Sequence, residues 1–205
     1  MRHRDDSHTR TGDRGFSLTE LILVVGIFGV LAAIALPIGQ SAVGGHRLGG
    51  EGHAVSYQLG LAKMRAAAAF TRARVFCDVP NRTFRIETWD KAGGAWVTEG
   101  GAERLTGAVQ FGAGAAAAPP PDTQLVIQQP AQCREGLDSG SAAIANSACV
   151  VFNSRGVPID DTGAPTGQNA VYVTDGTGVY AATVSVSGQT QLWWTPGANT
   201  VWQRQ

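Results

Sequence analysis

Hydrophobic residues concentrate in one long run near the start of the chain and recur in short clusters after it. Every residue from Leu21 to Leu36 is apolar or glycine, and no charged side chain occurs between Glu20 and His46. A helix over residues 16–36 would be roughly 30 Å long, the thickness of one hydrocarbon core. The pattern predicts a single membrane-spanning helix. Glu20 lies at its edge, where a carboxylate needs a partner.

The next periodic segment predicts a helix that leads into a strand. Its apolar residues recur at helical spacing and form a stripe that suits packing against a sheet. The residues of this stripe are Val55, Leu59, Ala62, Ala66 and Ala69. From Arg72 to Cys77 the period changes to two, because arginines alternate with apolar residues, and this alternation is typical of a strand.

Short strands and many turns are expected over the rest of the chain, which is rich in glycine, proline, threonine and valine. The DKAGG stretch between two strand-like runs predicts a hairpin. Residues 112–122 (GAGAAAAPPPD) have low complexity and predict a surface loop or linker. Strands are expected within residues 83–89, 95–100, 124–129, 148–158, 169–175 and 180–194.

A glycine-rich stretch, residues 38–52, separates the two predicted helices. It contains six glycines, each of which costs about 1 kcal/mol relative to alanine inside a helix. Pro37 precedes it and favours a kink or local melting of the first helix. We therefore expect a hinged or extended segment, or a flexible loop that joins two separate helices.

Charge gives no overall preference for a polyanionic partner, because the formal net charge is zero. Basic residues nevertheless cluster between Lys63 and Arg85, with Asp78 as the only acid among them. Arg72, Arg74, Arg82 and Arg85 could contact phosphates if they shared one face. A solvated, salt-bridged helix face is the favoured interpretation of the cluster, so nucleic acid is not expected as a partner.

The three cysteines allow one disulfide. Cys133 and Cys149 bracket a polar loop, and closing a loop of this size contributes about 3 kcal/mol in the chain-entropy model. We favour this pair, with Cys77 as a buried strand thiol; a pair that uses Cys77 is the alternative. An oxidising compartment would permit either pair.

Motifs for metal or enzyme chemistry are absent from the sequence. There is no CxxC pair for zinc, no GxSxG nucleophile and no glycine-rich phosphate loop. His46 and His53 fall in the glycine-rich stretch, where a solvated hinge is favoured over a metal site. The DDTG stretch, residues 160–163, predicts a turn. We expect a protein that is not an enzyme and holds no cofactor or metal.

The start of the apolar run carries a resemblance to a known signal. Gly15-Phe16-Ser17-Leu18-Thr19-Glu20-Leu21, followed by apolar residues to Pro37, resembles the type III signal of type IV pilins and type II secretion pseudopilins. The resemblance implies that a prepilin peptidase cleaves between Gly15 and Phe16 and that Phe16 is N-methylated. The leader, residues 1–15, would stay in the cytoplasm, and residues 16–37 would be a membrane and assembly helix. Glu20 would meet the cationic amine of a neighbouring subunit, which offsets part of the cost of the two charges in lipid and fixes the register between subunits.

The rest of the chain resembles the GspH/FimT branch of these proteins. The helix-to-strand junction at residues 59–77, Trp96 and Val97 after Gly94, and Phe152 with Gly156 and Gly188 carry this resemblance. It implies an α+β fold, in which a long N-terminal helix packs on an antiparallel sheet body. Residues 53–205 would form a periplasmic domain on a single-pass anchor in the bacterial inner membrane.

The function that these resemblances imply is structural. The chain would be a minor pseudopilin of a type II secretion pseudopilus, with other pseudopilins as partners. A minor type IV pilin for pilus assembly, adhesion or DNA uptake is the alternative. Three other interpretations predict different outcomes: a secretory signal would be cut after the apolar run, a plain anchor would stay uncut, and a DNA receptor would bind in a salt-dependent way.

Overall fold

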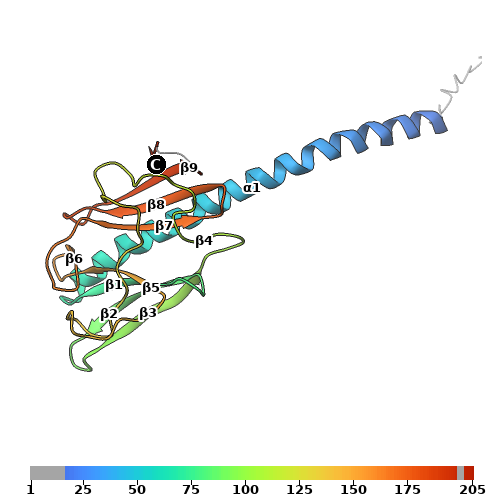
Figure 1. The fold of residues 1–205 in the computed structure, drawn as a ribbon. Coiled ribbons are helices and arrows are strands. Elements are labelled where there is room, and N and C mark those ends of the chain that lie inside the picture. Colours follow the sequence, from blue (N-terminus) through green and yellow to red (C-terminus); the bar gives the residue numbers. More distant parts are fainter. Residues whose placement is uncertain (1–16, 198–200) are drawn as a thin grey trace, which may run out of the picture. The chain divides into compact units, whose positions relative to one another are not determined.

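The computed structural model describes residues 17–197 and 201–205, with the side chains of all of these except residues 36–43. The chain divides into two compact units, Met1–Ala42 and Val43–Gln205. One helix, α1 (Leu18–Ala68), begins in the first unit and ends in the second. Antiparallel strands follow it (Figure 1), so the expected α+β class, a long N-terminal helix followed by antiparallel sheets, is confirmed.

In the first unit, α1 has an apolar surface that no other described residue covers. The segment Leu18–Ala35 is long and apolar enough to cross a membrane, and none of it is buried. Large side chains such as Ile22, Phe28 and Leu31 are more than half exposed. In water this much exposed hydrocarbon is unfavourable. The helix therefore requires an apolar environment, either lipid or other helices.

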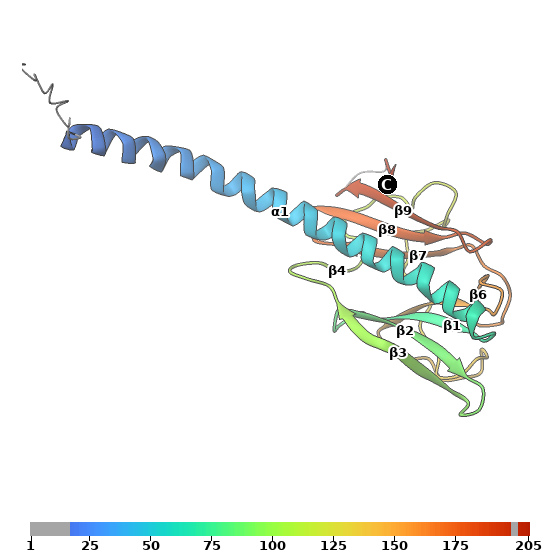
Figure 2. The same ribbon diagram turned by 180° about the vertical axis from the view of Figure 1, so that it is seen from behind.

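The second unit contains two five-stranded antiparallel sheets (Figures 1 and 2). The first sheet has the strand order β3-β2-β1-β5-β6. Its strands are β1 (Ala73–Asp78), β2 (Thr83–Asp90), β3 (Ala95–Arg104), β5 (Ser147–Phe152) and β6 (Pro158–Ile159). The hairpin expected around DKAGG is confirmed as β2 and β3, which pair from Asp90↔Ala95 onward.

The second sheet has the order β10-β9-β8-β7-β4. Its strands are β4 (Gln110–Phe111), β7 (Asn169–Thr174), β8 (Gly178–Val184), β9 (Thr190–Pro196) and β10 (Gln203–Arg204). The sequence predicted two strands in this region, within residues 169–175 and 180–194. The structure has three strands there, because Gly188, at φ +73°, turns the chain between β8 and β9.

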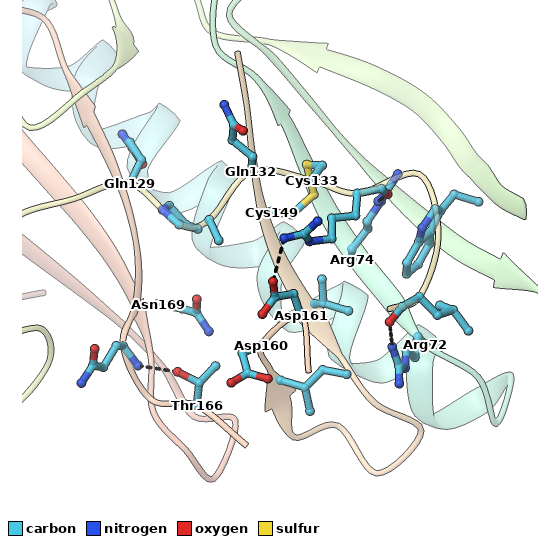
Figure 3. A pocket seen from close by; sticks show the side chains of 18 of the residues that line it. Arg72, Arg74, Gln129, Gln132, Cys133, Cys149, Asp160, Asp161, Thr166 and Asn169 are labelled. Atoms are coloured by element: carbon cyan, nitrogen blue, oxygen red, sulfur yellow. Dashed lines mark hydrogen bonds and ion pairs between the residues drawn. A yellow bond between two sulfur atoms is a disulfide. The ribbon is translucent and has the colours of Figure 1, made fainter. Parts of the chain in front are cut away.

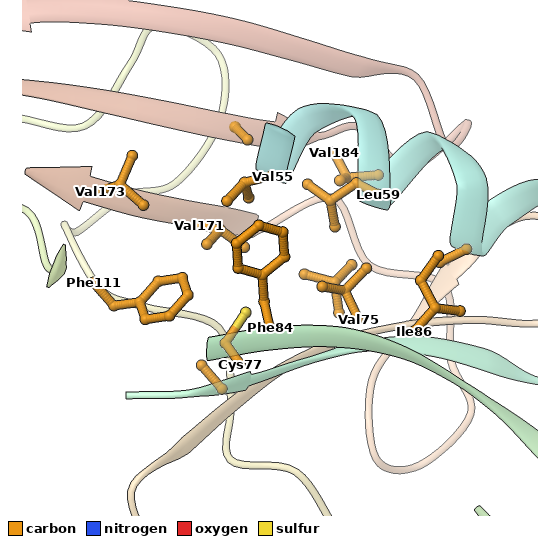
Figure 4. Close-up of a cluster of buried hydrophobic side chains, with 14 of the residues drawn as sticks. Val55, Leu59, Val75, Cys77, Phe84, Ile86, Phe111, Val171, Val173 and Val184 are labelled. Carbon is orange, nitrogen blue, oxygen red and sulfur yellow. The ribbon is translucent and has the colours of Figure 1, made fainter. Parts of the chain in front are cut away.

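The core lies where α1 meets both sheets (Figure 4). Val55 and Leu59 from the helix pack with Val75 and Phe84 of the first sheet and with Val171 of the second. The predicted helical stripe is confirmed at four of its five positions, which are fully buried. The fifth, Ala69, is exposed because α1 ends one residue before it.

The glycine-rich residues 38–52 belong to α1, where we expected a hinged or extended segment. Packing explains the helix. A Cβ atom at Gly52 would lie 2.9 Å from the ring of Tyr180 in β8, and one at Gly49 would lie 3.3 Å from the Tyr180 hydroxyl. Leu48, in the same stretch, is buried. Tertiary packing outweighs the low helix propensity of glycine, since glycine allows the helix to approach the sheet closely.

Residues 124–129 were predicted as a strand, and this prediction is wrong. Their amide side chains, not their backbone, bond to β7 and the residue before it. The Gln129 side chain donates to the Tyr172 carbonyl oxygen at 2.8 Å and accepts from the Tyr172 N–H at 3.1 Å. Gln124 donates to the Gln168 carbonyl oxygen and accepts from the Tyr172 hydroxyl. The segment thus covers the outer face of the second sheet without joining its ladder.

Candidate assembly site and the basic residues

Glu20 lies in the first turn of α1. The turn is closed by a hydrogen bond of 3.1 Å from the Leu21 N–H to the Ser17 carbonyl oxygen, and the Ser17 and Thr19 hydroxyls lie 2.8 Å apart. A carboxylate in this position is favoured by the positive end of the helix dipole. Glu20 is exposed, and it has no ion pair or hydrogen bond among residues 17–197 and 201–205. Its charge is thus available to a group outside the described chain.

Gly15 and Phe16 lie outside the described residues, so peptide cleavage and N-methylation remain predictions. Cleavage at that bond would create an amine four residues before Glu20. Pro37 falls within α1, but its side chain is not among those described, and the kink expected there stays a prediction. What the structure contributes is a helical start for Glu20 and an uncovered apolar surface after it.

The four arginines proposed for phosphate contact do not share a free basic face. Arg74 is 3 % exposed, and its Nε and Nη2 atoms both lie 2.6 Å from Glu87 Oε2. Arg85 approaches the other oxygen of Glu87 at 2.7 Å. Arg74 and Glu87 lie directly opposite each other on β1 and β2. The carboxylate of Glu87 thus pairs with both arginines within the sheet. Neither Arg74 nor Arg85 is therefore a free cation for a phosphate.

Burial lowers the pKa of Arg74, while the charge of Glu87 and its hydrogen bond oppose that shift. Arg82 donates to the Gly107 carbonyl oxygen at 2.8 Å, and Arg72 donates to that of Leu137 at 2.5 Å. These four arginines lie on or beside strands and not on a helix. For them, the expectation of a basic helix face is therefore wrong. Sequence reasoning also missed Glu87. The period-two alternation in β2 places Glu87 on the face opposite Ile86, together with Arg85, and could have indicated that these two charges pair.

Cys133 and Cys149 form a disulfide with a Cα–Cα distance of 4.9 Å, the pairing that the sequence favoured. Cys77 is a free, buried thiol, and burial raises its pKa to about 12. Cys149 lies in β5, so the disulfide ties Cys133 to that strand. Beside it, the Cys149 N–H donates to the Ala131 carbonyl oxygen at 2.9 Å. It thereby fixes a long connection to the first sheet.

A cavity of about 260 Å³ lies beside the disulfide (Figure 3). Arg134 and Asp161, which form an ion pair at 2.8 Å, both line it. Arg72, Arg74 and Asn169 line it as well. Asp160, on its rim, accepts hydrogen bonds from Thr162 and Ala164, which hold the pKa of its carboxyl below the usual value. The expected DDTG turn is thus present, and its carboxylate is used within the turn.

A metal-binding group of side chains is not found in the described part of the chain. No group of three or more histidine, cysteine, aspartate or glutamate side chains there could hold a metal ion. His46 and His53 are exposed on α1. The features that the described residues present to a partner are an apolar helix surface, one carboxylate at its start, and a sheet body.

Comparison with known proteins identifies a motif at the N-terminus. A profile of the prokaryotic N-terminal methylation motif matches residues 10–36, which include the predicted cleavage bond, Glu20 and most of the apolar run. No curated protein sequence matches the chain. Among solved structures, the chain is similar to the minor pseudopilin EPSH from the type II secretion system of Vibrio cholerae. The identity is 13 %, the TM-score is 0.43, and the match covers 75 % of this chain and 97 % of that one.

The structural similarity is too distant to carry an argument about function. The methylation motif is local and specific, and it coincides with the exposed apolar helix that the structure places after Glu20. Antiparallel sheets then follow that helix. The chain therefore carries a prokaryotic N-terminal methylation motif at the start of an exposed apolar helix, and antiparallel sheets follow that helix.

Proposed function

We propose that the protein is a minor pseudopilin, a non-enzymatic structural subunit at or near the tip of a type II secretion pseudopilus. One observation carries the proposal. Glu20 stands unpaired among the described residues at the start of an apolar, uncovered helix, inside a methylation motif. A free carboxylate beside hydrocarbon is unfavourable, and a cationic amine on a neighbouring subunit offsets part of that cost.

The membrane arrangement follows from the same helix. Residues 16–37 anchor the subunit in the inner membrane before assembly, the leader faces the cytoplasm, and the domain after the helix lies in the periplasm. Arginines in the leader agree with a cytoplasmic position. The Cys133–Cys149 disulfide supports an oxidising compartment for the second unit. Prepilin peptidase and other pseudopilins are the partners that this arrangement requires.

Replacement of Glu20 tests the assembly role. We expect Glu20→Ala to be cleaved and inserted normally, while the fraction recovered in sheared filaments falls at least tenfold. Glu20→Asp, which keeps the charge, retains part of the incorporation. Thr19→Ala changes the neighbouring exposed position in the same turn and serves as the control. Equal incorporation of the Glu20→Ala and wild-type chains would refute an assembly role for this carboxylate.

A minor type IV pilin is the second candidate, because the methylation motif is common to both systems. The choice of the secretion system rests on the resemblance of the body to the GspH/FimT branch. Deletion of the gene separates the two. The proposal predicts that exported proteins accumulate in the periplasm while surface piliation and twitching persist; lost piliation with normal secretion would favour the type IV pilin.

A further inference from the structure

Phe70 occupies a position in the fold that normally belongs to glycine. It is the second residue after α1, which ends at Ala68, and it has a φ of +48°, in the left-handed region. The Phe70 N–H bonds to the Ala67 carbonyl oxygen at 3.3 Å and the Thr71 N–H to that of Ala66 at 3.2 Å. This pair of bonds is a Schellman helix end, whose left-handed residue is usually glycine because a Cβ atom is strained there.

The Phe70 side chain gains little from the fold in return for that strain. It is 75 % exposed, and it is not part of any buried cluster in the described residues. A glycine at the same position would avoid both the strain and the exposed ring. The phenylalanine therefore does not serve stability. Strained residues that the fold does not need occur frequently at functional sites.

Two cations line the same groove as this ring. A shallow groove of about 260 Å³ contains Phe70 with Arg72, Trp89 and Lys91, and none of the described residues that line it is acidic. Lys91 is exposed and donates a bond of 2.7 Å to the Phe70 carbonyl oxygen. The neighbouring carboxylate of Asp90 accepts from the N–H groups of Ala92 and Gly93 within its own turn.

We propose that Phe70, Arg72 and Lys91 form a docking site for a partner protein whose surface presents an apolar pocket rimmed by carboxylates. The exposed ring enters the pocket, and the two cations match the rim. Aromatic anchors in desolvated pockets dominate binding energy at protein interfaces, and complementary charge sets the orientation. Charge complementarity selects this occupant, since the groove offers two cations and no acid.

A single-stranded nucleic acid would also suit one aromatic ring and two cations. Such ligands, however, need a basic path that follows the backbone over several nucleotides. Arg74 and Arg85 are paired with Glu87, Arg82 and Arg72 each bond to a backbone carbonyl oxygen, and the net charge is zero. The observations therefore favour a protein partner, and nucleic acid is an outcome of the test.

The test places a photo-crosslinker in the groove of the full chain in its host. Phe70 is replaced by p-benzoylphenylalanine, the cells are irradiated, and the adduct is mapped by mass spectrometry. We expect one discrete protein segment with apolar residues flanked by aspartate or glutamate. The same crosslinker at Leu125, which is 88 % exposed, is the control and should not give that adduct. No adduct, an adduct with nucleic acid or lipid, or a segment without acids would overturn the proposal.

Two variants separate docking from folding. Lys91→Gln keeps a donor for the Phe70 carbonyl oxygen but loses the charge, and it should lower the adduct yield severalfold. Phe70→Gly should raise Tm, since glycine suits the helix end, yet bind a synthetic copy of the mapped segment at least tenfold more weakly. Unchanged yield in the first variant, or unchanged affinity in the second, would refute the proposed site.

Discussion

Lys63 Nζ donates a hydrogen bond of 2.9 Å to the carbonyl oxygen of Gly188, which joins α1 to the turn between β8 and β9. The stem of Lys63 also lies against Gly156, in the turn after β5, where a Cβ atom would come within 2.9 Å of Lys63 Cγ. A Cβ atom at Gly188 would collide with the Gly156 carbonyl oxygen. Helix and both sheets therefore meet at this point through two glycine turns.

Gly188→Ala is expected to destabilise the protein by roughly 2–4 kcal/mol. The φ of +73° alone costs a non-glycine residue about 1–2 kcal/mol, and the collision with a backbone oxygen adds an overpacking cost. The free energy of unfolding from urea titration measures the effect. Gly94→Ala is the matched control, since Gly94 has a φ of +64° and open space around it. Equal losses in the two variants would mean that the close approach of Gly188 to the Gly156 carbonyl oxygen adds no cost.

Two glycines of α1 should respond to alanine with opposite signs. Gly50 has open space, so Gly50→Ala should stabilise the helix by up to about 1 kcal/mol. At Gly52 a Cβ atom would lie 2.9 Å from the Cβ and Cγ atoms of Tyr180, which cannot move away without the strand. Gly52→Ala should therefore cost about 1–3 kcal/mol. Thermal unfolding measures both, and stabilisation by Gly52→Ala would contradict the close packing of α1 on β8.

The buried pair of Arg74 and Glu87 should matter far more than an exposed one. Arg74→Ala leaves Glu87 in a buried site with only Arg85 as partner, and such a loss costs roughly 3–5 kcal/mol. Arg65→Ala breaks the exposed pair with Glu99, which contributes at most about 1 kcal/mol. Urea titration of both variants checks the ranking. A loss of under 1 kcal/mol for Arg74→Ala would show that the pair is not buried as described.

Alkaline pH should destabilise the fold through Cys77. Burial raises the pKa of its thiol to about 12 from 9.0, so the unfolded chain ionises first. The stabilisation is complete below pH 9 and is lost as pH rises from 9 toward 12, by at most about 1.4 kcal/mol per pH unit for one group. Tyr172, whose pKa burial raises to about 12, adds to the loss above pH 10.

Denaturant titrations from pH 8 to pH 11 test this dependence. Cys77→Ala removes the thiol, and its stability should fall less steeply with pH than that of the wild-type chain. The two proteins differ in absolute stability because alanine leaves a small cavity, so the slopes are compared and not the values. Parallel slopes would mean that the Cys77 thiol ionises equally well in the folded and unfolded chains.

Periodicity predicted the parts of the fold that depend on burial of one face. The stripe from Val55 to Ala66 is buried, and the hairpin around DKAGG has the expected pairing. Both patterns are local, and both follow from the spacing of apolar residues between turn residues. The membrane helix was predictable for the same reason, since an unbroken apolar run of that length has few alternatives in water.

Tertiary contacts decided the parts that the sequence did not predict. Residues 38–52 are helical because glycines let α1 approach Tyr180, and no local propensity reports a distant ring. Residues 124–129 read as a strand, yet Gln124 and Gln129 bond through their side chains. Arg74 looked solvated because its cross-strand partner, Glu87, is thirteen residues away. For the candidate site, the sequence indicated Glu20 but not the strained Phe70, whose φ only coordinates reveal.

The most direct measurement is the intact mass and N-terminal residue of the protein purified from its native membrane. The account predicts a chain that begins at Phe16, carries one methyl group on its amine and retains the whole apolar run. Each subunit would then have a cationic amine at its start that can pair with Glu20 of a neighbouring subunit, as the assembly proposal requires. A chain that still begins at Met1, or one cut after the apolar run, would contradict the proposal and leave a plain anchor or a secreted domain.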